Sequence, residues 1–458
     1  MKDSHYDVIG VGIGPFNLGL AALLEENTEI KAAFFDKTEV FQWHPGMLLE
    51  QSDLQVPFLA DLVTLADPTS KYSFLNYLHV HNRMYQFYFF KRFDVPRVEY
   101  NDYCQWVVSE LSTLHFGKMV TSVEYDRDHK LYNIEVQDVQ TGEATSYTTA
   151  HIVMGTGSTP FIPSPIDEKL NEDVIHTSRY KHYEKEFKES RSVTVVGSGQ
   201  SAAEVFYDLL LTQRENNYQL TWFTRSPGFF QLEAGKLGQE VFSPDYVQYF
   251  HELSYEKRKD ALPMLGGLRN GVEAETLHAI YDLLYHRSIR REDPAVMIQA
   301  MTSVNDVIKK EPMRYELMCE QWQQEEEFTH ETEKVVFATG YKPHLPDWLL
   351  DMKDEFKWES EKEFAVTNDY RLKFNDEREN HLFVLTNLEH SHGASATNLA
   401  LSVRRNQTII NTITRNEIFS LNNDTVFQQF DRKNEGAQPK AVLLFYVLLS
   451  GGVINNID

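Results

Sequence analysis

Two glycine-rich turns are the segments of this chain whose residue types and spacing could do chemistry. The first runs from Gly12 through Gly14 to Asn17, and the second runs from Gly197 through Gly199 to Ala202. Each follows an apolar run and precedes a helix-like one. Glycines at this spacing let the backbone turn tightly and approach a pyrophosphate, which then lies at the positive N-terminus of the following helix. One such match is a weak signal, but two indicate two dinucleotides and electron transfer between them.

The residue that ends the next strand distinguishes the two turns. Asp36 ends the apolar run 32–35, where an acid can bind a ribose hydroxyl. Arg225 ends the run 220–224, where its charge can pair with the 2′-phosphate of NADPH. We therefore expect NADPH rather than NADH at the second turn. The alternatives are a glycine turn without a ligand and, for Arg225, a solvated charge at a strand end.

Composition limits the classes of protein to consider. The chain has 458 residues, 42% of them hydrophobic, which is enough for two or three domains. Cys104 and Cys319 are the only cysteines, so a disulfide framework, a zinc cluster and a dithiol reductase mechanism are excluded, and we expect no metal. The net charge of −24 argues against a nucleic-acid partner; it either steers a cationic substrate or simply keeps the surface soluble. Without a signal-peptide pattern or a membrane-length apolar run, we expect a cytoplasmic protein with no membrane partner.

The order of strand-like and helix-like patterns predicts an α/β fold with two Rossmann-like dinucleotide-binding domains and a small helical substrate domain. The expected boundaries are 1–189 and 331–458 for the first domain, 190–235 and 321–330 for the second, and 236–320 for the helical domain. The first domain would resume with the strand 334–337. Two glycine-containing segments follow apolar runs, at 154–157 and 338–341. Each is either a place where the chain crosses between these domains or an ordinary turn.

Further segments make the chain similar to the microbial N-hydroxylating flavin monooxygenases of siderophore biosynthesis. They are 41–47, 54–62, 73–78, 240–244 and 392–393, of which Trp43-His44-Pro45-Gly46-Met47 is the most specific. The Phe-x-Gly-x-x-x-His signature of the Baeyer–Villiger and general flavin monooxygenases is absent, because His176 has no glycine four residues before it. The resemblance covers essentially the whole chain and favours the branch that hydroxylates diamines.

The resemblance implies a mechanism carried by cofactors, FAD in the first domain and NADPH in the second. NADPH reduces FAD, oxygen adds to give a C4a-hydroperoxyflavin that bound NADP⁺ shields, and the neutral amine attacks the distal oxygen. Gln55, facing the flavin, and Asn270, near NADP⁺ and substrate, are the catalytic candidates. By the same resemblance FAD contacts Gly12, Gly14, Asn17, Asp36, Trp43, His44, Gln55, Asn398 and Leu399; NADPH contacts Gly197, Gly199, Ala202 and Arg225; and the substrate contacts Ala60, Gln239 and Asn270.

The polar candidates also have plainer interpretations. Gln55, Gln239 and Asn270 could each be ordinary surface residues, and His44 and His392 could orient loops rather than act as bases. The family's small hydroxyl residue is Ala400 here, so one hydrogen bond to the flavin is either missing or supplied by Ser402.

Ala60 predicts the substrate class. Members that act on ornithine or lysine carry a Lys at this position, which pairs with the substrate carboxylate. Alanine offers that carboxylate nothing, so we expect a decarboxylated diamine, putrescine ahead of cadaverine, with oxygen as co-substrate. The alternatives are lysine or ornithine bound through another basic residue, another decarboxylated amine, a flavin oxidase or reductase without oxygen insertion, and a redox sensor that binds a protein. Relatives suggest a homotetramer.

Overall fold

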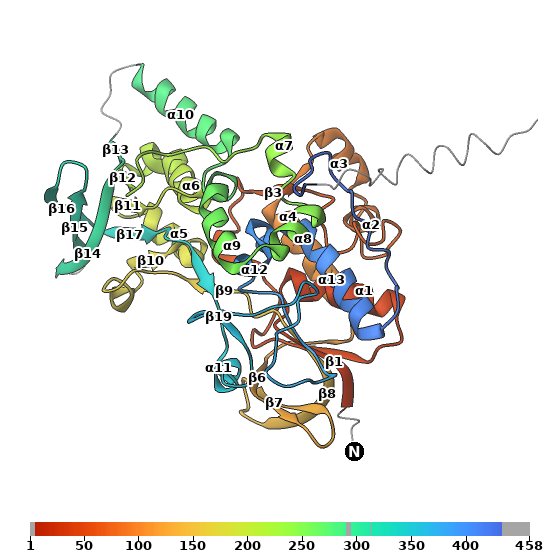
Figure 1. The fold of residues 1–458 in the computed structure, drawn as a ribbon. Coiled ribbons are helices and arrows are strands. Elements are labelled where there is room, and N and C mark those ends of the chain that lie inside the picture. Colours follow the sequence, from red (N-terminus) through yellow and green to blue (C-terminus); the bar gives the residue numbers. More distant parts are fainter. Residues whose placement is uncertain (1–4, 290–294, 312, 433–458) are drawn as a thin grey trace, which may run out of the picture.

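The computed structural model describes residues 5–289, 295–311 and 313–432 (Figure 1). The first sheet has seven strands in the order β5-β2-β1-β8-β7-β6, with β21 also paired to β8. Strands β1, β2, β5, β8 and β21 run parallel, whereas β6, β7 and β8 form an antiparallel extension. Their bounds are β1 His5–Val11, β2 Ala32–Phe35, β5 Leu114–His115, β6 Lys118–Asp126, β7 Leu131–Asp138, β8 Ala144–Met154 and β21 Leu382–Val384.

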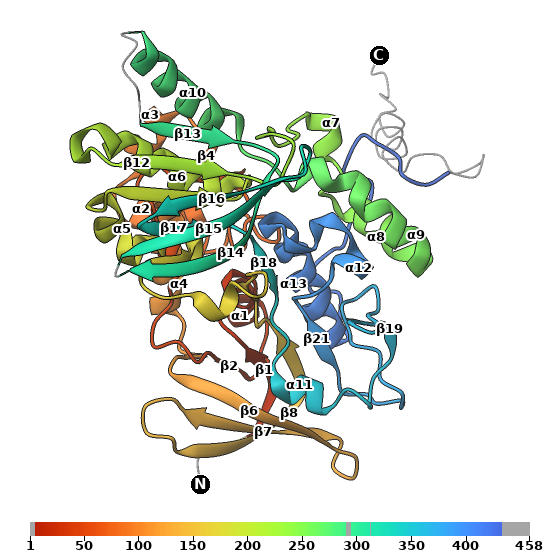
Figure 2. The same cartoon turned by 90° about the vertical axis from the view of Figure 1, so that its left-hand side faces the viewer.

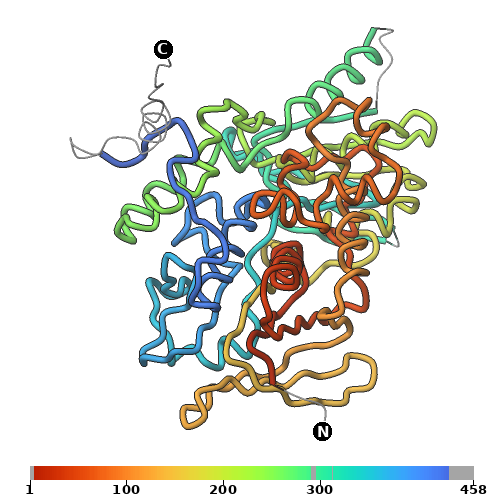
Figure 3. The backbone as a smooth tube through the Cα atoms, turned by 90° about the vertical axis from the view of Figure 1, so that its right-hand side faces the viewer, coloured from red at the N-terminus to blue at the C-terminus, as the bar shows by residue number. Residues whose placement is uncertain are grey.

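The burial patterns follow from this arrangement. The four residues of β2 are all buried, as in a parallel strand covered on both faces, whereas buried and exposed residues alternate along β7. One core beneath the sheet joins α1 (Pro15–Asn27), α2 (Phe74–Val80), α4 (Arg97–Glu110) and α13 (Leu399–Thr414). Figure 3 shows α1 in red, viewed along its axis, with α13 beside it. This sheet and its helices present the first glycine turn at the carboxyl end of β1.

The second sheet is entirely parallel, in the order β10-β17-β11-β12-β13. Helices α5, α6 and α10 pack on one face of it, and a separate three-stranded antiparallel sheet, β14-β15-β16, packs on the other face (Figure 2). The bounds are β10 Val174–His176, α5 Tyr180–Lys188, β11 Ser192–Val196, α6 Gln200–Asn216, β12 Gln219–Phe223, α10 Ala274–Ser288, β13 Val296–Gln299, β14 Thr302–Glu311, β15 Arg314–Gln321, β16 Glu326–Thr332 and β17 Lys334–Phe337.

Two expected boundaries are wrong. The strand Lys334–Phe337 does not return to the first sheet but lies between β10 and β11 in the second. The range 236–320, expected to be helical, includes β13, β14 and all but the last residue of β15. A short, fully buried apolar strand has no feature that names its partner, so only the pairing in the folded chain decides the sheet to which it belongs. Within the expected domains, residues 1–4, 290–294, 312 and 433–458 lie outside the described residues.

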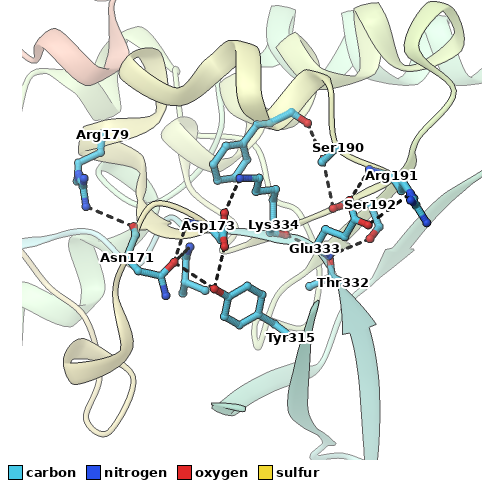
Figure 4. Close-up of polar contacts among 12 residues, drawn as sticks. Asn171, Asp173, Arg179, Ser190, Arg191, Ser192, Tyr315, Thr332, Glu333 and Lys334 are labelled. Carbon is cyan, nitrogen blue, oxygen red and sulfur yellow. Dashed lines mark hydrogen bonds and ion pairs between the residues drawn. The ribbon is translucent and has the colours of Figure 1, made fainter. Parts of the chain in front are cut away.

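Buried polar contacts fix β17 in its place (Figure 4). Lys334 Nζ pairs with Asp173 Oδ1 at 2.5 Å, and the Tyr315 hydroxyl donates to Asp173 Oδ2 at 2.9 Å. The Glu333 carboxylate accepts from the Arg191 amide at 2.8 Å. These contacts lie at the amino ends of the strands, so the opposite, carboxyl edge is left to the second glycine turn.

The chain crosses between the two sheets through β9 (Ser158–Pro160) and β18 (Tyr341–Pro343), which pair antiparallel. The two glycine-containing junctions anticipated as crossings therefore do run side by side. Among the described residues, no helix is both long and apolar enough to cross a membrane. The remaining elements are η1 Pro45–Met47, β3 Asp53–Pro57, α3 Met84–Phe90, β4 Asp94–Pro96, η2 Asp167–Lys169, η3 Thr177–Arg179, α7 Lys236–Gln239, α8 Pro244–Glu252, α9 Tyr255–Ala261, η4 Leu262–Leu268, α11 Asp347–Asp351, β19 Trp358–Ser360, β20 Glu363–Phe364, α12 Glu389–His392 and η5 Ala394–Thr397.

Candidate functional site

The glycines of the first turn have different structural roles. Gly14 caps α1, no side chain caps the helix there, and a Cβ added to Gly14 would have no protein atom within 4 Å. Gly12 has φ +88°, and a Cβ there would lie 2.4 Å from the carbonyl oxygen of Gly155. Gly12 therefore permits close packing against the strand β8 junction, whereas Gly14 leaves open space in front of a helix N-terminus.

Asn17 and Asp36 hold this turn in shape. Asn17 Nδ2 donates to the Gly12 carbonyl at 2.7 Å, while its buried Oδ1 has no hydrogen-bond partner among the described residues. Asp36 Oδ2 accepts from the Ile13 amide at 2.7 Å, and Oδ1 accepts from the Thr38 amide at 2.8 Å. Asp36 thus reaches the turn, and because Oδ1 also accepts from the Thr38 hydroxyl at 2.7 Å, the carboxylate has three such bonds and can still accept one more, from a ribose hydroxyl.

The second turn repeats the first. Gly199 caps α6 without a side-chain cap, and a Cβ added to it would again meet nothing within 4 Å. Gly197 has φ +141°, and a Cβ there would lie 2.4 Å from the Ala338 carbonyl oxygen. Ala202 is fully buried in the core under the second sheet, which allows α6 to pack closely.

The charge at the ribose end differs between the turns. Gly12 N donates to Phe35 O and Gly197 N donates to Phe223 O, both at 2.8 Å, so Thr224 occupies the place that Asp36 holds in the first turn. Arg225 follows it and is exposed. Within the described part of the chain its guanidinium forms no ion pair, although its carbonyl accepts from Trp322 Nε1 at 2.8 Å. A cation without a nearby carboxylate suits a phosphate rather than a free ribose hydroxyl.

The residues therefore fit two ligands that carry pyrophosphate groups. Each turn combines an open approach at its second glycine with a helix N-terminus that no side chain caps, and backbone N–H groups at such an end bind phosphate.

The Trp43–Met47 segment joins the two sheets. A Cβ on Gly46 would lie 1.8 Å from the Ser178 carbonyl oxygen, so only glycine allows η1 to approach η3. Met47 and Leu49 are buried in the core of the second sheet, although they come from the first part of the chain. Trp43 is fixed by its amide, which donates to Asn101 Oδ1 at 2.8 Å.

Of the two histidines that could act as bases, His392 is buried, whereas His44 is exposed. Desolvation by the surrounding protein atoms, aided by the nearby Arg97 charge, nevertheless lowers the pKa of His44 to about 4. Burial also holds the pKa of His392 well below its usual value, and its ring stacks on Tyr370 with centroids 4.4 Å apart. Both rings are therefore neutral near pH 7, which favours their interpretation as residues that orient loops.

Gln55 and Ala60 lie on one segment. Gln55 is exposed on β3, and Ala60 is 2% exposed in the loop that follows. The buried carboxylate of Asp61 fixes this loop by accepting from the amides of Val63, Thr64 and Phe74 at 3.0, 2.7 and 2.7 Å. Burial nevertheless raises the pKa of Asp61. Ala60, which is expected to set the substrate class, therefore lies in a fixed loop and presents only a methyl group.

Gln239 and Asn270 lie on two neighbouring segments of the helical region. Glu233 N donates to Gly267 O at 2.9 Å, and a Cβ on Gly238 would lie 3.8 Å from Leu268 Cδ2. Both amide side chains are exposed. Across the described residues, no hydrogen bond connects either of them with Gln55 or Ala60.

The start of α13 carries the last flavin-side candidates. Asn398 caps this helix by accepting from the Leu401 amide at 3.3 Å, and Leu399 packs against the first core. The Ser402 hydroxyl donates to the Leu399 carbonyl at 2.6 Å and is buried. Its proton is therefore engaged within the helix in this structure.

Sequence reasoning missed two residues at this site, Arg97 and Glu204. They form an ion pair between α4 and α6, with side chains only 13% and 4% exposed. The signal was present, since Glu204 is a lone acid in the apolar stretch Ala202-Ala203-Glu204-Val205-Phe206, and such an acid is rarely buried unless it is paired.

Comparison with known proteins gives one family. The model of the L-lysine 6-monooxygenase/L-ornithine 5-monooxygenase family matches residues 4–343. The chain is 39% identical over 428 residues to the putrescine N-hydroxylase of Shewanella oneidensis, covering 93% of this chain and 84% of that protein. The FAD-bound structure of DfoA, the cadaverine monooxygenase of desferrioxamine biosynthesis from Erwinia amylovora, matches with a TM-score of 0.89 and 36% identity, covering 94% of this chain and 100% of that one. An ornithine N-hydroxylase from Kutzneria sp. 744, with reduced FAD, NADP⁺ and L-ornithine, matches with a TM-score of 0.84 and 26% identity, covering 90% and 99%.

Proposed function

The chain belongs to the L-lysine 6-monooxygenase/L-ornithine 5-monooxygenase family, and from this premise we propose that it N-hydroxylates a primary aliphatic diamine. Putrescine is the favoured substrate and cadaverine the next. The reaction uses NADPH and oxygen and gives a hydroxylamine for hydroxamate siderophore biosynthesis. The observation that carries the choice of substrate is Ala60, a buried residue without charge in the rigid loop after β3.

Two cofactors supply the redox chemistry: NADPH provides the hydride, and FAD, once reduced, activates oxygen. The chain holds FAD at the first turn, where the N-terminus of α1 and the open side of Gly14 accept the pyrophosphate and Asp36 accepts from the ribose. It holds NADPH at the second turn, where α6 and Gly199 do the same and Arg225 pairs with the 2′-phosphate. Similarity to the FAD-bound DfoA and the NADP⁺-bound Kutzneria enzyme supports both assignments.

The other residues orient the reactants and exclude water. The rings of Trp43 and His44 lie side by side with centroids 4.8 Å apart, and His44 is neutral near pH 7, so it adds no positive charge to the site. Gln55 orients the flavin side of the site, and Asn398 and Leu399 close it at the start of α13. No side chain is assigned as a nucleophile, because the reacting amine is itself the nucleophile.

The substrate site recognises an amine rather than an amino acid. A primary ammonium has a pKa of about 10.4 and no lone pair, so it must lose its proton before it reacts. Gln239 and Asn270 contribute amide groups that hydrogen-bond the diamine without adding charge. A substrate carboxylate near Ala60 would be buried without a partner at a cost of several kcal/mol, which lowers affinity tenfold for about every 1.4 kcal/mol.

The assembly and location are part of the same proposal. The stretch 84–90 carries no charged residue, none of α3 is buried, and Tyr85, Tyr88 and Phe89 are 79%, 69% and 69% exposed. Apolar surface of this kind marks contact sites, and an uncharged face is where copies with a net charge of −24 can meet without repulsion. We assign a homotetramer that uses this face. The test is the mass in solution, which should be lower for a Tyr85→Glu/Phe89→Glu variant than for the unmodified protein.

Both cysteines are unpaired and buried, which suits the reducing cytoplasm.

Product analysis tests the function. Purified protein with NADPH and oxygen is given putrescine, cadaverine, ornithine and lysine in parallel, and products are identified by mass spectrometry. We expect one added oxygen atom on the diamines and little product from the amino acids. Aldehyde and peroxide without hydroxylamine would indicate an oxidase, and faster coupled hydroxylation of ornithine or lysine would overturn the substrate assignment while leaving the flavin chemistry intact.

A further inference from the structure

The parts of the chain that carry the two glycine turns are joined by a buried ion pair. Arg97 Nη1 and Nη2 donate to Glu204 Oε2 and Oε1 at 2.9 and 2.8 Å. Arg97 is the first residue of α4, under the first sheet, and Glu204 lies one turn into α6, under the second. A bidentate pair fixes both distance and angle between the groups that it joins.

Each end of the pair continues toward a cofactor turn. Arg97 Nη1 also donates to the carbonyl of Met47 at 3.0 Å, which closes the segment that carries Trp43 and His44. On the other side, Gln200 Nε2 donates to Glu204 Oε1 at 3.1 Å. Gln200 is the first residue of α6 and directly follows Gly199.

Gln200 is itself held at a second point. Its Oε1 accepts from the Glu273 amide at 2.8 Å, and its Nε2 lies 3.2 Å from Thr276 Oγ1. Hydrogen bonds therefore run without a break from Met47, on the flavin side, to the residue beside the pyrophosphate-binding glycine of the second turn. Apolar packing of Met47 and Leu49 into the second core lies along the same route.

We propose that Arg97, Glu204 and Gln200 form a positioning bridge that sets the second turn relative to the Trp43–Met47 segment for hydride transfer. The inference rests on the proposed function, since it assumes FAD at the first turn and NADPH at the second. Reacting atoms must come within about 3–3.5 Å, and a shift of about 1 Å can slow a reaction by about 100-fold. The bridge acts through geometry and touches neither reacting atom.

The test measures flavin reduction by NADPH under anaerobic conditions. Glu204→Gln keeps the size of the side chain but leaves Arg97 buried without its counter-charge. We expect the limiting reduction rate to fall about 10- to 100-fold, while the FAD absorbance spectrum, the FAD content and the NADP⁺ dissociation constant measured by fluorescence stay within about threefold of the unmodified protein. Gln200→Ala, which leaves the ion pair intact, should lower the rate in the same way, and it serves as the test if Glu204→Gln does not fold.

Asp173→Asn is the matched control. It removes another buried ion pair of the same sheet, with Lys334, but at the amino edge of the strands, away from the second turn (Figure 4). It should lower the melting temperature and leave the reduction rate unchanged. The bridge is refuted if Glu204→Gln or Gln200→Ala is folded, holds FAD and is reduced at the unmodified rate, or if Asp173→Asn slows reduction equally. Failure of the unmodified protein to hold FAD or to be reduced by NADPH would instead refute the proposed function.

Discussion

Gly12→Ala and Gly14→Ala, two residues apart, should fail in different ways. At Gly14 the backbone has φ −88° and ψ 179°, which any residue adopts, and the new methyl group would meet no protein atom within 4 Å. The free energy of unfolding of the FAD-free protein should therefore change by no more than about 0.5 kcal/mol. Gly12 has φ +88°, and alanine there costs about 1–3 kcal/mol of backbone strain, to which the 2.4 Å approach to the Gly155 oxygen adds.

FAD affinity should respond in the opposite way: Gly14→Ala should weaken FAD binding directly, and Gly12→Ala only indirectly. The methyl group of Gly14→Ala occupies the approach to the α1 N-terminus, and loss of one hydrogen bond to a charged phosphate costs about 1.5–3 kcal/mol, or about 10- to 150-fold in the FAD dissociation constant. Gly12→Ala should lose FAD only as far as it loses its fold. A side chain at Gly12 would meet the Gly155 carbonyl, directly after β8, rather than fill the space in front of the α1 N-terminus.

The assay pairs FAD titration of the FAD-free protein, followed by quenching of flavin fluorescence, with thermal unfolding of the same samples. Gly199→Ala is the matched control, since it alters the equivalent glycine of the second turn and should leave FAD affinity unchanged. Unmodified FAD affinity in Gly14→Ala, or equal destabilisation of the two FAD-free variants, would show that the assignment of the first turn is wrong.

Four further outcomes follow from the same geometry. Arg225→Ala should weaken the binding of NADPH by about 1.5–3 kcal/mol and leave the binding of NADH unchanged. The control is Arg191→Ala, which removes an exposed arginine at the far edge of the sheet. An unchanged ratio of NADPH to NADH affinity would remove Arg225 from the site. Ala60→Lys should depress diamine turnover by placing a like charge near the substrate, and unchanged putrescine kinetics would place residue 60 outside the pocket. Hydroxylation should rise from pH 6 to pH 9 as the amine loses its proton, whereas a steady fall in a stable enzyme would argue against attack by the neutral amine. The folded-state pKa of His44 is about 4, below its ordinary 6.5, so the unfolded chain binds this proton first as the pH falls. The contribution of neutral His44 to the free energy of unfolding is therefore complete above pH 6.5 and is lost as the pH falls toward 4. His44→Gln should flatten this part of the profile of melting temperature against pH.

Several features could be predicted from the amino-acid sequence because they depend on near neighbours. Two glycines spaced by one residue, between an apolar strand and a helix, form the same turn wherever the fold places them, so both glycine turns could be placed from the sequence, as could the charged residues Asp36 and Arg225 after the next strands. The family likewise followed from short runs such as Trp43-His44-Pro45-Gly46-Met47, and the proposed diamine substrate from one alanine, Ala60.

Tertiary structure alone decided the features that depend on residues distant in the sequence. Lys334–Phe337 could belong to either sheet until its partners, β10 and β11, were known. Gly12 needs to be glycine because of Gly155, which is brought to it by β8. The pair of Arg97 and Glu204 joins residues 107 positions apart, and no local pattern specifies such a partner. A buried charge requires a counter-charge, but which residue supplies it depends on how the two sheets pack together.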